Sequence, residues 1–150
     1  MSVATSEPSV ASPVTPGVSP GFRLMPATIG RPGHTQVAWI PCPAWCEQDH
    51  LTDREVAIED IDHYSRMSGW SIDSLLSPGE EVHSLYVRVH SDPSHEDHRL
   101  RAAHVLIGNG APFDSYLTPD VADQAADELE AFAARIRATA RTARAANACA

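Results

Sequence analysis

The stretch Pro41-Cys42-Pro43-Ala44-Trp45-Cys46-Glu47-Gln48-Asp49-His50 concentrates the reactive side chains of this 150-residue chain. It holds two of the three cysteines, one of the three tryptophans and a histidine, and we name it the Cys/Trp/His block. The β-branched and aromatic segment 35–40, which precedes it, predicts a strand. Pro41 and Pro43 lack the N–H that a sheet ladder needs, so the strand is expected to end there. We therefore predict that the fold is organised around this block.

The block supplies three ligands of a candidate structural zinc site, Cys42, Cys46 and His50, and His63 supplies the fourth. Thiolate and imidazole are the ligands that zinc prefers, and four of them close a tetrahedral structural site. A small protein also gains stability from a metal staple. The pattern Cys-x3-Cys-x3-His-x12-His departs from the common zinc-finger spacings, so this hypothesis requires four side chains to converge. Zinc is the candidate cofactor, and no other is expected.

Three other interpretations of the polar residues remain open at this point. In the first, Trp45 and Cys46 are core residues, and His50 hydrogen-bonds the local backbone. In the second, Cys46 is a redox or nucleophilic thiol with His50 as its base. In the third, a hydrolytic metal centre gathers histidines and acids of the second half of the chain: His90, His95, His98, His104, Asp92 and Asp97.

Composition outside the block predicts one domain with a tail. Residues 1–34 hold six of the twelve prolines among Ser, Thr, Ala and Val, and such a segment buries too little apolar surface to become ordered. We predict a disordered tail over 1–34 and a single small α+β domain over 35–146.

The pattern after residue 70 is mostly that of strands, followed by one helix. Strands are predicted over 72–76, 82–90, 102–108 and 113–116, with a turn at 77–80 and a short helix over 53–61. Thr118 and Pro119 are a typical helix start. An apolar stripe follows at helical spacing: Val121, Ala125, Leu129, Phe132 and Ile136. The expected fold class is α+β, with a small antiparallel sheet of three to five strands covered by one C-terminal amphipathic helix.

Charge and hydropathy exclude several classes of partner. The net charge is −9, and residues 41–100 hold thirteen of the twenty acidic residues, so nucleic acid is not expected as a partner. No apolar run approaches the ~18 residues of a membrane span, and the start of the chain lacks the pattern of a secretory signal. Three cysteines make no disulfide framework. We expect a cytoplasmic protein without membrane contact.

The motif Pro-x-Trp-Cys-x-x-x-His at residues 43–50, the later His63 and the Leu-Thr-Pro start of the helix at residue 117 together resemble a known family. It is a family of small uncharacterised actinobacterial proteins, a domain of unknown function, and the resemblance covers roughly residues 37–136. It implies the limits of the domain and no reaction. We therefore expect a non-enzymatic accessory or protein-interaction module with an unknown protein partner. A small metal-dependent enzyme or a thiol-based redox protein is the alternative.

Overall fold

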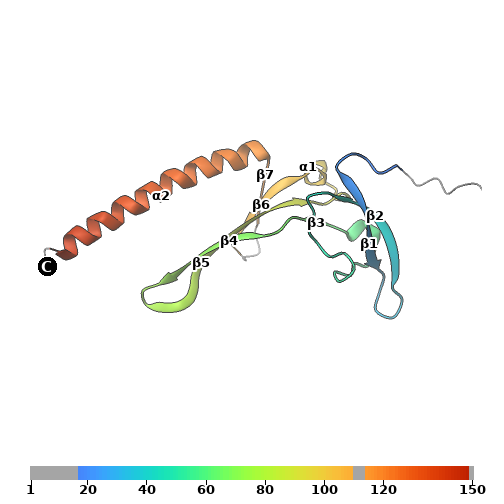
Figure 1. The fold of residues 1–150 in the computed structure, drawn as a ribbon, viewed down its shortest axis with the longest axis horizontal. Helices are drawn as coiled ribbons and strands as arrows, with labels where there is room; N and C mark the ends of the chain where they lie inside the picture. The colour runs from blue at the N-terminus through green and yellow to red at the C-terminus, as the bar shows by residue number, and fades with distance from the viewer. Residues whose placement is uncertain (1–16, 110–113, 149–150) are drawn as a thin grey trace, which may run out of the picture.

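The protein, in a computed structural model that describes residues 17–109 and 114–148, is an α+β structure (Figure 1). The predicted fold class is therefore confirmed. The strands form two antiparallel sheets, one of two strands and one of five, and a long helix follows them. The larger sheet has the predicted number of strands, and the smaller sheet is an addition to the prediction.

The two-stranded sheet is a hairpin of β1 (Phe22–Ile29) and β2 (Gln36–Pro43). Its turn contains Gly30 at a φ of 114°, a conformation that side chains other than glycine rarely adopt. The prediction of a disordered tail over 1–34 is therefore corrected, because β1 lies inside that range. The apolar residues of β1 become buried only when β2 pairs with them, and amino-acid composition does not reveal such long-range pairing. Residues 1–16 of the predicted tail lie outside the described residues.

β2 extends beyond the point at which Pro41 and Pro43 were predicted to end it. Pro41 and Pro43 both belong to β2, where they pair in register with Leu24 and Phe22. Since β2 has β1 as its sole partner in a two-stranded sheet, one of its edges is free of ladder bonds, and proline is tolerated on such edge strands. This continuation carries Cys42 into the ordered sheet.

The five-stranded sheet is organised around its longest strand, β5 (Ser77–Ser91). The others are β3 (His63–Tyr64), β4 (Ser68–Ser74), β6 (His104–Gly108) and β7 (Ser115–Leu117). β5 pairs with β3, β4 and β6, and β6 pairs with β7. β4 and β5 form a long hairpin that projects from the body of the molecule (Figure 1). Its turn is Leu75–Leu76 instead of the predicted 77–80, and both leucines are at least 90% exposed.

Two of the three helical segments are short. A 3-10 helix, η1 (Ile58–Asp60), replaces the predicted helix over 53–61, and α1 (His98–Arg101) is a single turn. Thr52, which directly precedes the predicted helix, donates its hydroxyl to the Asp49 carboxylate at 2.8 Å. That turn redirects the chain before a helix can start.

The C-terminal helix, α2 (Pro119–Ala148), begins as predicted after Thr118. The Thr118 carbonyl accepts from the Ala122 N–H at 2.9 Å, and its side chain accepts from the Val121 N–H at 3.3 Å. Its apolar stripe faces the sheet across an open groove of about 530 Å³, and no described residue of the helix is buried. Within the described part of the chain, no helix is long and apolar enough to cross a membrane.

The buried core is small and lies at the β1–β2 end of the molecule. Its buried apolar residues are Ala27, Ile29, Ile40 and Ile61, each at most 8% exposed. The two largest side chains with less than 2% exposure are Cys42 and Cys46. So little buried apolar surface leaves a chain of this size in need of another source of stability.

Candidate metal centre

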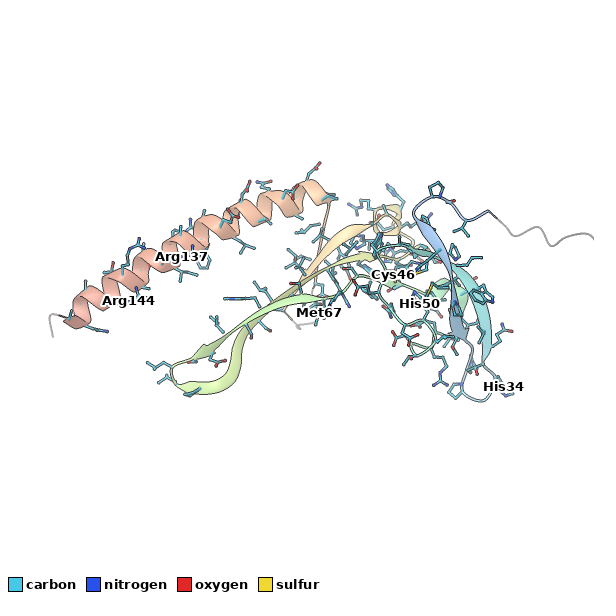
Figure 2. All side chains as sticks on the ribbon, viewed as in Figure 1. His34, Cys46, His50, Met67, Arg137 and Arg144 are labelled. Atoms are coloured by element: carbon cyan, nitrogen blue, oxygen red, sulfur yellow. The ribbon has the colours of Figure 1, made fainter. Side chains whose placement is uncertain are left out.

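The four residues that the sequence singled out as zinc ligands meet in one buried cluster. One ligand atom from each of Cys42, Cys46, His50 and His63 lies within 4.8 Å of the others. All four residues are at most 3% exposed. Figure 2 shows Cys46 and His50 at the junction between the β1–β2 hairpin and the rest of the molecule. The convergence that the spacing alone left open is therefore present.

Each ligand is positioned by a different part of the local fold. Cys42 lies in β2 and His63 in β3, so the cluster spans both sheets. A tight turn follows β2, in which the Cys46 N–H donates to the Pro43 carbonyl at 3.0 Å. The guanidinium of Arg23 in β1 donates to the Cys46 carbonyl at 2.7 Å. This turn brings the Cys46 sulfur back toward the Cys42 sulfur.

The loop that carries His50 is tied to both sheets by backbone hydrogen bonds. The Thr28 N–H of β1 donates to the His50 carbonyl at 2.8 Å, and the Glu47 N–H donates to the Tyr64 carbonyl of β3 at 2.9 Å. The Asp49 carboxylate accepts from the Leu51 N–H at 3.1 Å and so closes the turn just after His50. The imidazole is therefore held in place by its backbone.

Two distances inside the cluster match those of a tetrahedral metal site. The Nε2 atom of His50 lies 3.7 Å from the Cys42 sulfur and 3.6 Å from the Cys46 sulfur. With Zn–S near ~2.3 Å, Zn–N near ~2.0–2.1 Å and a tetrahedral angle, sulfur and nitrogen ligands are expected about 3.6 Å apart. The two sulfur–nitrogen distances therefore suit a tetrahedral zinc site.

Burial keeps Cys42, His50 and His63 uncharged in the absence of metal. It raises the pKa of the Cys42 thiol to about 11, and the nearby Cys46 sulfur adds to that shift. Burial likewise lowers the pKa of His50, and it lowers the pKa of His63 to about 4, with a further contribution from the charge of His50. Neutral imidazoles are ready to bind a metal, whereas the thiols must release their protons when it binds.

His63 contributes an atom that the protein leaves without a partner. Its Nδ1 is buried and has no hydrogen-bond partner. Leaving a buried polar atom unpaired costs about 1–3 kcal/mol, so such atoms are rare and call for an explanation. This nitrogen is therefore available as a metal ligand.

The other interpretations of the block fit the geometry less well. Trp45 is only half-buried, and the Nε2 atom of His50 faces two sulfurs instead of a backbone carbonyl. For the thiol-redox interpretation, Cys46 and His50 are close together but buried. A small cavity of about 80 Å³ reaches His50 but not Cys46. A nucleophilic thiol needs an exposed, low-pKa environment, and neither thiol is exposed.

The predicted hydrolytic centre does not assemble. His90 in β5 and His104 in β6 are buried, whereas His98 is exposed at the start of α1, beside Asp97. Among the described residues, the cluster around Cys42 is the single group of three or more Cys, His, Asp or Glu side chains with metal-binding geometry.

A second buried polar cluster lies next to the metal site, and it was not expected from the sequence. The Nδ1 of His104 donates to the Ala102 carbonyl at 2.9 Å, so its Nε2 is free to accept from His90 Nδ1, also at 2.9 Å. The Nε2 atom of His90 lies 3.4 Å from the Asp62 carboxylate without hydrogen-bond geometry, and that carboxylate accepts from the Tyr64 hydroxyl at 3.0 Å. Burial alone would raise the pKa of Asp62, but its interactions with His90 and Tyr64 outweigh it and lower that pKa. The network joins β3, β5 and β6 directly behind His63.

Comparison with known proteins identifies the family of the chain. Residues 13–145 match a family model described as a domain of unknown function, DUF6907. No curated protein and no solved structure matches the chain. The resemblance to a domain of unknown function is therefore confirmed, and the match begins well before the predicted domain start at residue 35.

Proposed function

This chain belongs to the DUF6907 family, a domain of unknown function, and we propose that it is a non-enzymatic protein-interaction module held together by a structural zinc ion. One observation carries the proposal: the buried ligand atoms of Cys42, Cys46, His50 and His63 lie within 4.8 Å of one another. Packing alone gives no reason for two thiols and two imidazoles to meet in one place.

Zinc is the metal that this ligand set favours. Two thiolates and two imidazoles in a tetrahedral arrangement are typical of zinc, whereas calcium and magnesium prefer oxygen ligands. The sulfur–nitrogen distances of 3.6 and 3.7 Å support the same choice.

A structural role is favoured over a catalytic one because the protein supplies all four ligands. Catalytic zinc keeps one position open for water or substrate. Here each of the four residues is at most 3% exposed, so a bound ion would have neither a free position nor access to substrate. No residue is assigned a catalytic role.

The site also explains how the two sheets stay together. Cys42 belongs to the two-stranded sheet and His63 to the five-stranded sheet, while the buried apolar cluster in the described part of the chain contains four residues. A zinc ion would therefore crosslink two sheets that share little apolar contact. Such an ion contributes binding free energy directly to folding.

An interaction role is supported by the exposed apolar surface outside the core. Trp39 on the hairpin is 66% exposed, and Trp70 on β4 is 53% exposed. The proposal includes a reducing cytoplasmic location, because the site needs free thiols. It includes neither a nucleic acid nor a membrane as partner, since the net charge is −9.

The test is elemental analysis of the purified untagged full-length chain, repeated on serine variants of its cysteines. We expect about one zinc per chain in the native protein, as four protein ligands bind a single ion. Cys42→Ser should lose the metal, and the matched control Cys149→Ser should keep it. A native protein purified in the presence of zinc that contains none would refute the zinc proposal.

A further inference from the structure

Helix α2 leaves its apolar stripe largely open. Leu129, Phe132 and Ile136 are each half exposed, although they face the sheet across the groove. Trp70 and Leu85, on the opposite wall of that groove, are also exposed. Figure 1 shows α2 and the β4–β5 hairpin leaving the body of the molecule as two separate arms. Contiguous apolar surface of this kind marks a site of association.

The charges of α2 are divided between its two halves. The first half carries five acidic residues: Asp120, Asp123, Asp127, Glu128 and Glu130. The second half carries four arginines: Arg135, Arg137, Arg141 and Arg144. Figure 2 shows Arg137 and Arg144 on the part of the helix that extends beyond the body. A second copy of this helix in antiparallel orientation would set acidic half against basic half, so the helix is complementary to itself.

The apolar stripe follows a heptad pattern that fixes the register of such a pair. Leu129 and Ile136 occupy a positions, and Ala125 and Phe132 occupy d positions. In an antiparallel pair, Leu129 then packs against the partner's Phe132, and Ala125 against the partner's Ile136. A two-fold axis between residues 130 and 131 relates the helices, as an isologous dimer requires.

The residues that flank the stripe select this register. Glu128 and Arg135 are the g positions on either side of Leu129, and the same register sets Glu128 opposite the partner's Arg135. Two equivalent ion pairs result. A shift by one heptad would instead place Arg135 opposite the partner's Arg135, which is repulsive. On the other flank, the e positions Ala126, Ala133 and Ala140 are small and permit close approach of the two helices.

We propose that the occupant of this surface is a second copy of the chain, with the two α2 helices antiparallel along the mouth of the groove and Glu128 paired with the partner's Arg135. The inference names a partner for the proposed interaction module and rests on that role, but it does not depend on zinc. Zinc content measured on the same samples separates failure of one proposal from failure of the other.

The experiment is sedimentation equilibrium of the full-length protein, with charge-swapped variants. We expect a dimer, and Glu128→Arg should weaken it by about tenfold because it turns two attractive pairs into two repulsive ones. Arg135→Glu should weaken it similarly, and the double swap should restore it. Asp127→Arg is the matched control: that residue lies on the opposite face of the helix, so this variant should weaken the dimer far less than Glu128→Arg.

Phe132→Asp supplies an independent readout, because it places a charge in the centre of the apolar seam. It should yield a monomer with native helix content by circular dichroism, since Phe132 is already half exposed. A native chain that stays monomeric at every concentration measured would overturn the proposal. A dimer that survives Phe132→Asp, or that responds equally to Asp127→Arg and Glu128→Arg, would do the same.

Discussion

Replacing Cys46 with serine should lower the free energy of unfolding by the amount that metal binding contributes to it. Cys46 is completely buried, and its sulfur lies 3.6 Å from His50 Nε2. Serine is nearly isosteric, so little packing is lost, but a hydroxyl is a poor zinc ligand. A ligand that binds only the folded chain, present at 1,000 times its Kd, adds about 4 kcal/mol to the free energy of unfolding. We expect Cys46→Ser to lose at least about that much, since structural zinc sites bind more tightly still.

For a domain of this size, a loss of about 4 kcal/mol corresponds to a fall in melting temperature of roughly 10–20 °C. The assay is thermal melting with and without a zinc chelator. Chelation should lower the native melt to that of Cys46→Ser, and it should leave Cys46→Ser itself unchanged. Cys149→Ser should melt like the native protein in both conditions. A Cys46→Ser variant that melts within a degree or two of the native protein in zinc would refute the linkage argument.

Two further perturbations test the role of the site and the turn of the hairpin. His63→Ala should release the β1–β2 hairpin from the larger sheet. Amide hydrogen exchange should then accelerate in β1 and β2 more than in β5 and β6. The exposed control His98→Ala should leave the exchange rates of all four strands unchanged. Gly30→Ala should lower the free energy of unfolding in urea by about 2–4 kcal/mol, because φ is 114° there and a Cβ would collide with the backbone carbonyl of His34. Gly33→Ala, at a φ of 84° with open space around its Cβ position, should cost only about 1 kcal/mol. Equal losses at the two glycines would contradict the steric account.

Three of the four residues of the Cys/His cluster could be picked out from the sequence because they are close together in the chain. Cys42, Cys46 and His50 lie within nine residues, so ligand type and spacing alone drew attention to them. The start of α2 could be predicted for the same reason, because the capping signal lies in two adjacent residues, Thr118 and Pro119. In both cases the decisive interactions span only a few positions of the chain.

The features that the sequence did not reveal depend on pairing between distant segments. β1 becomes a strand only because β2 pairs with it, whereas the proline content of residues 1–34 pointed to disorder. His90 and His104 meet because the register of β5 and β6 sets them directly opposite each other. A shift of that register by one residue would turn one of the two imidazoles to the opposite face of the sheet. No pattern local to either histidine carries that information.

The order of the four ligands along the chain has a consequence for biosynthesis. At ~10 residues per second, His63 leaves the ribosome roughly one second after His50, and β5, which pairs with β3, follows later still. On the zinc proposal, residues 42–50 would supply three ligands to the ion before any strand of the five-stranded sheet has been synthesised. The arrival of His63 would then close a short loop around that ion, and loops of this length close far faster than synthesis proceeds. Metal binding would then precede the folding of β3, the first strand of the larger sheet in chain order, and would nucleate it.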